Sequence, residues 1–203
     1  MGSEMCIRDS NGFGRIGRNV FRALIENPRE ALEMVAVNTI PSLADSAYLL
    51  EFDSVHGRLP TPVSTNGDIM EVGSHKVKFL SERNPENLDW SALNIDVVLE
   101  CTGIFTDAEK ASVHLAGGAK KVLVSAPSKG ADLTVVYGVN HTIISSEHKI
   151  ISNASCTTNC LAPIAHILNN ICGIKQGFMT TIHSYTGDQR ILDTEHNLSL
   201  IHI

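Results

Sequence analysis

One stretch sets the architecture of this chain: Asn11-Gly12-Phe13-Gly14-Arg15-Ile16-Gly17-Arg18, which contains the pattern G-x-G-x-x-G. In such a pattern the first glycine allows a tight turn, the second lets the main chain approach a pyrophosphate, and the third lets a helix lie close to a sheet. Apolar residues at helical spacing follow as far as Asn27-Pro28, and residues 32–37 then predict a second, parallel strand. This context favours a dinucleotide-binding unit, with phosphate at the helix N-terminus, over a plain glycine turn.

The second strand of such a unit usually ends in an acidic residue that binds the adenosine ribose. Here the strand ends Val37-Asn38-Thr39, with no carboxylate. Because a missing negative charge removes the repulsion against a 2′-phosphate, we expect NADP to be accepted alongside NAD. The alternative is that Thr39 simply hydrogen-bonds the ribose hydroxyl.

Strand and helix patterns alternate along the following residues. Nearly continuous apolar runs at 96–101 and 121–125 predict strands buried on both faces, with a helix at 106–116 between them and further strands at 133–137 and 148–152. Residues 43–50 look helical, 53–57 form a loop, and 68–72 with 75–80 predict a hairpin. The pattern is typical of an α/β protein with a doubly wound, mostly parallel Rossmann-type sheet, whose ligands bind beyond the carboxyl ends of the strands. Thr102-Gly103, Ser125 and the turn before Cys156 all lie at such ends.

A second chemical motif is the hydroxyl-rich turn Ser152-Asn153-Ala154-Ser155-Cys156-Thr157-Thr158-Asn159-Cys160. Asn153 and Ser155 are good N-cap types, and the apolar residues from 161 to 172 have the spacing of one buried stripe, so we expect a helix from about Cys156. A thiol in the first turn lies among unpaired N–H groups at the positive end of the helix, which lowers its pKa. Cys156 is therefore a candidate nucleophile.

Residues 178–183 predict a strand that returns His183 to the start of that helix. A thiol–imidazole pair of this kind activates cysteine for covalent catalysis. The alternative is a small core thiol and a packing imidazole. We interpret Cys160 as structural, and Cys101 and Cys172 as core residues. We expect no metal site, because C-x₃-C is not a recognised zinc spacing.

Composition narrows the class of partner. The chain has 203 residues, 43% of them hydrophobic, which is enough for a substantial core. Its formal charge of −6 and the absence of a Lys/Arg stripe argue against nucleic acid, and no apolar run is long enough to span a bilayer. Five cysteines, an odd number, indicate reduced thiols in a reducing compartment such as the cytoplasm.

Taken together, the glycine fingerprint, the block Ser155-Cys156-Thr157-Thr158-Asn159-Cys160 and Thr180-Thr181-Ile182-His183 resemble the phosphorylating glyceraldehyde-3-phosphate dehydrogenases, from Asn11 to about Leu198. The resemblance implies that Cys156 attacks an aldehyde to give a thiohemiacetal, His183 takes the proton, and hydride passes to the nicotinamide. Inorganic phosphate then releases the thioester as an acyl phosphate, 1,3-bisphosphoglycerate. A cytoplasmic, glycolytic homotetramer that uses glyceraldehyde 3-phosphate and phosphate is implied as well.

The same resemblance implies roles for further residues. Ser155 and Thr157 match an inorganic-phosphate site, and Thr186 matches a contact to the substrate phosphate. Members of the family usually carry Asp at the position of Thr39. The expected cofactor contacts are Asn11, Gly12, Phe13, Gly14, Arg15, Ile16, Gly17, Thr39, Arg83, Thr102, Gly103 and Ser125.

Two alternatives stay open. Erythrose-4-phosphate dehydrogenase shares the Cys–His pair, although Thr186 favours the triose enzyme. The second alternative is a nucleotide-binding module without turnover, because the family's substrate arginine and nicotinamide-side asparagine lie beyond this sequence. Residues 1–10 and 199–203 do not follow the family pattern, and Arg8-Asp9 interrupts the short run that could extend before the glycines. We therefore expect foreign ends around a dinucleotide-binding domain at 11–153 and the truncated start of an α+β catalytic domain at 154–198.

Overall fold

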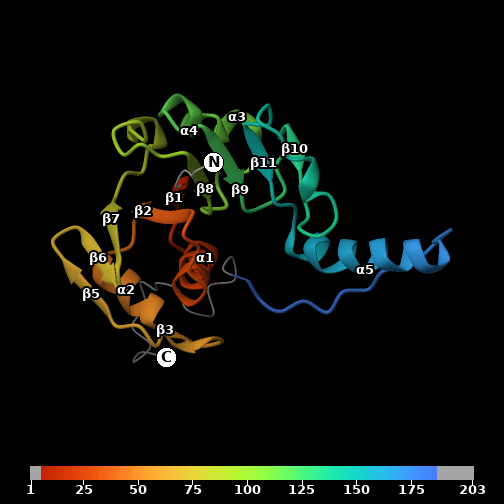
Figure 1. Ribbon diagram of the computed structural model, residues 1–203, viewed down its shortest axis with the longest axis horizontal. Coiled ribbons are helices and arrows are strands. Elements are labelled where there is room, and N and C mark those ends of the chain that lie inside the picture. Colours follow the sequence, from red (N-terminus) through yellow and green to blue (C-terminus); the bar gives the residue numbers. More distant parts are fainter. Residues whose placement is uncertain (1–5, 187–203) are drawn as a thin grey trace, which may run out of the picture.

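A computed structural model describes residues 6–186, with side chains from residue 9 onward. The chain opens with β1 (Cys6–Asn11), α1 (Arg15–Glu26) and β2 (Leu32–Asn38). The two strands pair in parallel, with Asn11 opposite Asn38. This is the βαβ unit that the glycine pattern predicts. It places the turn after Asn11 at the carboxyl edge of the sheet (Figure 1).

The unit is the centre of a nine-stranded sheet in the order β10-β11-β9-β8-β1-β2-β7-β6-β5. The added strands are β5 (Val63–Asn66), β6 (Ile69–Val72), β7 (His75–Leu80), β8 (Val97–Glu100), β9 (Lys121–Val124), β10 (Leu133–Thr134) and β11 (Ile150–Ser152). All neighbours pair in parallel except β5 with β6 and β6 with β7. The expected α/β, doubly wound Rossmann-type sheet is confirmed, with a small antiparallel edge.

Helices cover both faces of the sheet. Figure 1 shows α1 and α2 (Leu43–Glu51) on one side and the short helices α3 (Ala108–Ala111) and α4 (Val113–Ala116) on the other. Phe21 and Met34 belong to the core beneath α1, whereas Trp90 and Val98 belong to a second buried cluster. No helix among residues 6–186 has both the length and the apolar character needed to cross a membrane.

The sequence interpretation of β1 was wrong in one respect. The strand continues through Arg8 and Asp9, with a shift in its register to β2 between them. Because β1 is paired on both sides, its main-chain hydrogen bonds hold a polar sequence in the sheet centre. Asp9 is fully buried there, its Oδ2 has no hydrogen-bond partner among the described residues, and burial raises the pKa of its carboxyl.

Smaller differences concern the extent of elements. The helix expected at 106–116 is two short helices that meet at Ser112, and the strand expected at 133–137 is confined to Leu133–Thr134. The loop expected at 53–57 belongs to a hairpin of β3 (Phe52–Asp53) and β4 (Gly57–Arg58). Short 3-10 turns occupy Pro85–Asn87 and His141–Ile143.

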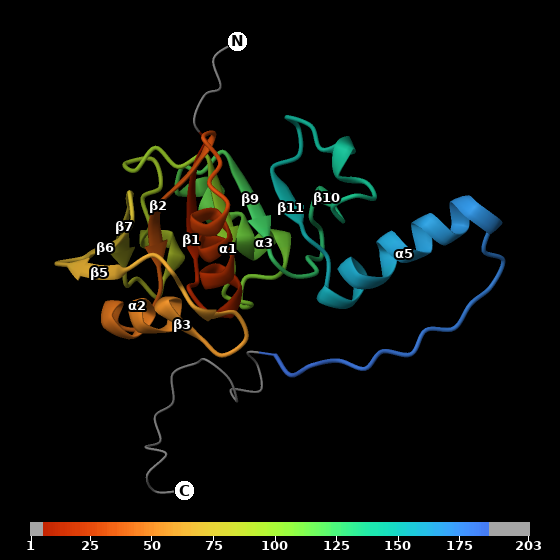
Figure 2. The ribbon, with the colours of Figure 1, turned by 60° about the horizontal axis from the view of Figure 1, so that its bottom comes forward.

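The largest difference concerns α5 (Cys156–Cys172). Its apolar stripe was expected to be buried, yet the helix has no buried residue, and Ile171 is 75% exposed. Figure 2 shows α5 extending away from the sheet, with the chain after it running back without a strand. The strand expected at 178–183 is absent because no described strand lies beside it to pair with. Cys172 is exposed rather than in the core, as is Cys160, whereas Cys101 packs against the α1 core.

Candidate active site

Each of the three glycines of the fingerprint is needed for a different steric reason. Gly12 has φ +98°, and a Cβ there would lie 2.8 Å from Thr102 N. A Cβ on Gly17 would lie 2.2 Å from the carbonyl oxygen of Gly12, so only glycine lets α1 pass so close to the turn. Gly14 has no atom within 4 Å of its Cβ position, which leaves space beside the main chain. These are the three roles predicted from the sequence, with open space where a pyrophosphate would approach.

The N-terminus of α1 also has no side chain of its own that would compensate its positive dipole. Gly14 is the N-cap and provides no side-chain hydrogen bond, and the first turn contains no acidic residue. The first N–H groups of a helix need acceptors and carry the positive end of its dipole. A phosphate group would satisfy both requirements.

A cleft of about 340 Å³ lies beside this turn. Its lining includes the expected residues Asn11, Gly12, Phe13, Gly14, Thr39, Arg83 and Thr102. It also includes Asn38, Glu82 and Phe105, which the sequence analysis did not select. The sequence could have indicated Asn38 through its position, because it is the last residue of β2 and so lies at the carboxyl edge, where ligands bind.

Asn38 joins three segments around the cleft. Its Nδ2 donates to Asn11 Oδ1 at 2.8 Å and to the Glu82 carbonyl at 2.9 Å, and its Oδ1 accepts from Glu82 N at 2.8 Å. Next to it, Thr39 N donates to the Leu80 carbonyl at 2.9 Å, and Thr39 is 7% exposed. No carboxylate stands at position 39, although Glu82 brings one to the same cleft.

Five expected cofactor residues do not line the cleft: Arg15, Ile16, Gly17, Gly103 and Ser125. Arg15 NH1 instead forms a 3.0 Å ion pair with Asp53 Oδ2, from the β3–β4 hairpin. Burial opposes ionisation of Asp53, but hydrogen bonds from the main-chain N–H groups of His56 and Val55 and from Arg15 hold its pKa below the ordinary value. Ser125 follows β9 and donates its N–H to the Glu100 carbonyl at 3.0 Å. Their contact with a cofactor stays a prediction.

The structure brings the predicted thiol and imidazole, Cys156 and His183, into contact. Cys156 Sγ lies 3.0 Å from His183 Nε2, although no strand carries His183 there. His183 Nδ1 is 2.6 Å from the Ser184 carbonyl, and a carbonyl only accepts, so Nδ1 carries a proton and Nε2 faces the sulfur. The hydrogen bond from His183 lowers the pKa of the Cys156 thiol, and the Ser184 carbonyl followed by Cys156 raises the pKa of His183. Both shifts favour thiolate beside imidazolium.

The helix end supports the same thiol. Ser155 is the N-cap of α5, and its Oγ accepts from Thr158 N at 3.0 Å. Cys156 is therefore the first helical residue, and the Thr157 N–H adds to the lowering of its pKa. A groove of about 410 Å³ lies beside the pair, lined by Thr157 and the Met179–Ser184 segment among others. Ser155 and Thr186 do not line it, so their phosphate roles stay predictions.

The cleft and the thiol turn share one edge of the sheet. β1, β8, β9 and β11 are mutually parallel, so the turns after Asn11, Glu100, Val124 and Ser152 all leave the same edge. Figure 2 shows α5 beginning at the edge where α1 also begins. Cofactor and thiol can therefore act on one substrate at that edge.

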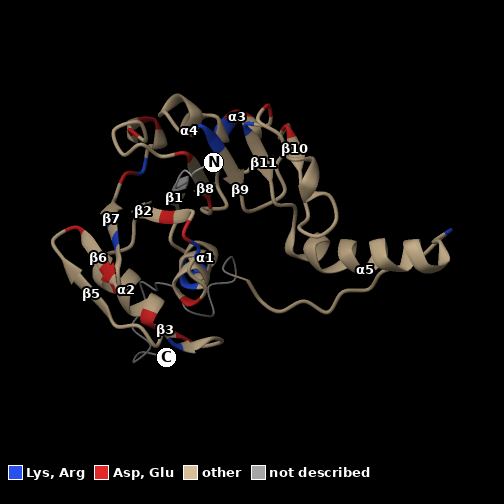
Figure 3. Ribbon diagram, viewed as in Figure 1, with Lys and Arg blue, Asp and Glu red and all other residues tan. Residues whose placement is uncertain are grey.

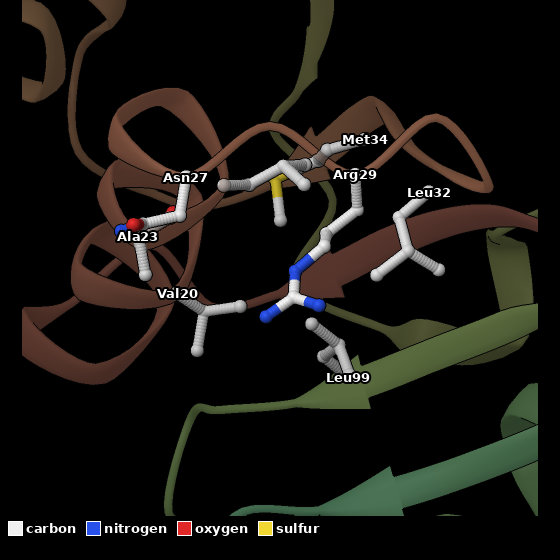
Figure 4. A pocket seen from close by; sticks show the side chains of 8 residues that line it. Val20, Ala23, Asn27, Arg29, Leu32, Met34 and Leu99 are labelled. Atoms are coloured by element: carbon white, nitrogen blue, oxygen red, sulfur yellow. The ribbon is translucent and has the colours of Figure 1, made fainter.

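Another cavity lies elsewhere. It measures about 320 Å³ between α1, β2 and β8, and Figure 4 shows the Arg29 side chain crossing its apolar lining. Arg29 is its one charged lining residue, and the lining includes no thiol, carboxylate or imidazole. This cavity therefore offers no nucleophile, acid or base for catalysis.

A parallel sheet with a glycine turn beside a cleft, and a Cys–His pair at the same edge, is the architecture of a dinucleotide-binding α/β protein with a thiol that an imidazole can activate. The family model for the NAD-binding domain of glyceraldehyde 3-phosphate dehydrogenase matches residues 9–108, and the model for its C-terminal domain matches residues 155–201. The chain belongs to the glyceraldehyde 3-phosphate dehydrogenase family.

Curated proteins of the same family are similar to this chain over most of its length. Glyceraldehyde-3-phosphate dehydrogenase of Xanthobacter flavus is 59% identical over 186 residues, which are 92% of this chain and 56% of the relative. The enzymes of Cereibacter sphaeroides and Geobacillus stearothermophilus are 55% and 54% identical, again over 92% of this chain and 55% of each relative. The chain thus spans a little over half the length of the curated relatives it matches.

Proposed function

We propose that the whole protein is an NAD-dependent phosphorylating aldehyde dehydrogenase that converts glyceraldehyde 3-phosphate and inorganic phosphate to 1,3-bisphosphoglycerate. The observation that carries the proposal is the 3.0 Å contact between Cys156 Sγ and His183 Nε2 at the edge that also holds the glycine turn. The family membership and the names of the relatives support the choice of substrate.

Cys156 and His183 supply the covalent chemistry. The thiolate attacks the aldehyde carbon, and the imidazolium donates its Nε2 proton to the developing alkoxide, which gives a neutral thiohemiacetal. His183, now neutral, takes the hydroxyl proton back as the carbon loses hydride. The Ser184 carbonyl keeps Nδ1 protonated throughout, so the ring presents Nε2 to the reaction. Phosphate then attacks the thioester and restores the Cys156 thiolate.

The residues at the glycine turn fit a dinucleotide. Open space at Gly14, an uncapped α1 and a cleft of about 340 Å³ with Asn11, Thr39 and Arg83 in its lining match the pyrophosphate and the adenosine half. NAD, when bound, accepts the hydride. We propose that Asn11, Gly12, Phe13, Gly14, Thr39, Arg83 and Thr102 contact it directly. Five further residues that do not line the cleft belong to the proposed cofactor site: Arg15, Ile16, Gly17, Gly103 and Ser125.

NADP is proposed as a second acceptor. Thr39 brings no carboxylate to the end of β2, which favours tolerance of a 2′-phosphate. Titration of the chain with NAD and NADP tests this, and Thr39→Asp is the matched variant. We expect Thr39→Asp to weaken NADP binding about tenfold while NAD binding changes little. Strong rejection of NADP by the unaltered chain would contradict the proposal.

Turnover distinguishes the enzyme from a nucleotide-binding module. A module is favoured for the 203 residues by themselves because α5, which carries Cys156, has no buried residue. NADH formation from glyceraldehyde 3-phosphate and phosphate is the assay, with erythrose 4-phosphate as the competing substrate. We expect no turnover from the isolated chain and turnover from the full-length protein with a preference for the triose. Vigorous turnover by the isolated chain would overturn the module reading.

Three further properties are proposed for the whole protein. The residues at 11–153 form its dinucleotide-binding domain and those from 154 begin its catalytic domain, as the change from sheet to exposed helix suggests. Assembly as a homotetramer is proposed from the family. A cytoplasmic location is proposed because the four cysteines among the described side chains are free thiols.

A further inference from the structure

A chain of buried polar side chains lies directly behind the cofactor cleft. Glu100, the last residue of β8, is 1% exposed, and His114 of α4 and Trp90 are fully buried. Trp90 Nε1 donates to His114 Nδ1 at 3.1 Å, and His114 Nε2 lies 3.0 Å from Glu100 Oε2. Neither Trp90 nor His114 lines the cleft. Buried polar groups cost stability unless every one is paired, so a network this complete needs a reason.

The direction of each hydrogen bond follows from donor chemistry. An indole N–H only donates, so His114 Nδ1 must accept from Trp90 and carries the lone pair of the ring. The proton of the neutral ring is then on Nε2 and is donated to Glu100. Trp90 thus selects the tautomer of His114, and His114 in turn holds one oxygen of the Glu100 carboxylate.

Glu100 also accepts hydrogen bonds from two residues that line the cleft. Its Oε2 accepts from Asn11 Nδ2 at 2.7 Å, and its Oε1 accepts from Thr102 N at 2.8 Å and from the Thr102 hydroxyl. Asn11 and Thr102 both line the cleft. The Thr102 N–H is also the group that a Cβ on Gly12 would meet, so its position sets the space available to the glycine turn. One carboxylate therefore holds the cleft ends of β1 and β8 together.

We infer that Glu100, oriented by His114 and Trp90, is a positioning residue for dinucleotide binding. This inference rests on the proposed function of the cleft. Glu100 touches neither cofactor nor substrate, and it acts by holding the Asn11 side chain and the Thr102 main chain where the dinucleotide meets them. The arrangement is rigid because four donors converge on one carboxylate that is buried from solvent.

Isothermal titration of NAD into the 203-residue chain tests the inference. Glu100→Gln has nearly the same shape, but its N–H₂ group must face a donor, because all four partners of Glu100 donate. We expect NAD to bind about tenfold more weakly. His114→Leu removes a donor from Glu100 and leaves the Trp90 N–H unpaired, so a similar loss is expected. His114→Gln keeps one acceptor and one donor, and should bind NAD within about threefold of the unaltered chain.

A control separates positioning from stability. Val98→Ala shortens a fully buried side chain on the same strand; Val98 packs in the cluster that contains Trp90, but the substitution removes none of the hydrogen bonds of the polar network. It should lower stability by packing loss and leave the NAD affinity within about twofold. The chain has one tryptophan, so its indole N–H gives a single ¹H–¹⁵N resonance, which should lose its hydrogen-bonded downfield shift in His114→Leu and keep a hydrogen-bonded shift in His114→Gln.

The outcomes are distinct. Unchanged NAD affinity in Glu100→Gln and His114→Leu, or an equal loss in Val98→Ala, overturns the inference. If the unaltered chain binds no NAD, the proposed function fails separately, and hydrogen exchange at the Thr102 amide decides the network. Faster exchange in Glu100→Gln and His114→Leu than in Val98→Ala supports positioning, and equal exchange overturns it.

Discussion

The cofactor edge, at the ends of β1, β2 and β8, differs from the thiol segment, which consists of α5 and residues 173–186. At the cofactor edge Asn11, Asn38 and Glu100 are all at most 5% exposed and are tied to one another through their side chains. In the thiol segment none of the α5 residues is buried, and Figure 3 shows the helix without a single charged residue. The sheet holds the cofactor edge in place, whereas the Cys156–His183 pair rests on contacts within its own segment. Two halves of one site thus differ in what supports them.

Removal of the thiol should have the largest effect. Cys156→Ala in the full-length protein should lower turnover by at least about a thousandfold, because it removes the thiol that His183 activates. NAD affinity should stay within about twofold, since the cofactor edge is held by the sheet. NADH formation and NAD titration are the two measurements. Cys160→Ala, one helical turn away and also exposed, is the control and should keep most of the activity. Retained turnover in Cys156→Ala would remove the covalent mechanism.

Strain at the glycine turn should come next. Gly12→Ala places a Cβ 2.8 Å from Thr102 N at φ +98°, and should cost about 3 kcal/mol of unfolding free energy as well as NAD binding. Gly14→Ala meets no atom within 4 Å, so it should fold with a cost below about 1 kcal/mol while still obstructing the pyrophosphate. Urea unfolding and NAD titration separate the two. Equal stability of both variants would contradict the steric account of the turn.

The buried carboxyl of β1 should give a pH-dependent effect of intermediate size. Burial raises the folded-state pKa of Asp9, so its penalty is absent below the unfolded pKa and grows as pH rises toward the folded pKa. Asp9→Asn should therefore stabilise the chain by about 2 kcal/mol near pH 7, and by less at acidic pH. Unfolding midpoints between pH 4 and 8 measure this. Asp68→Asn removes an exposed carboxylate near Lys78 and is the control for the loss of one negative charge.

The smallest effect is expected within the thiol segment. His183 lowers the pKa of Cys156, so thiolate is present at lower pH in the unaltered chain. In His183→Ala the pKa of the thiol should rise, which shifts the pH profile of iodoacetamide alkylation upward and slows it about tenfold at pH 7. A Cys160→Ser background isolates the signal. An unshifted profile would mean that the pair does not act as a unit in solution, unlike the cofactor edge.

Local sequence patterns predicted many of the structural features of this protein. The steric roles of Gly12 and Gly17, the start of α5 at Cys156, and the approach of His183 to that thiol could all be predicted from residue type and spacing. Each depends on a few neighbouring residues or on one loop closure. The Rossmann-type sheet followed from the same alternation, because parallel strands joined by helices have few possible arrangements.

Other features needed the three-dimensional arrangement. No local pattern joins Trp90, His114 and Glu100, because they come from a loop, a helix and a strand and meet only when the layers pack. The polar Arg8-Asp9 pair is part of β1 because strands on both sides supply its hydrogen bonds. The apolar stripe of α5 predicted burial, but a stripe specifies only which face would be covered. Whether a neighbour covers that face depends on packing, which is why α5 is exposed here despite its sequence.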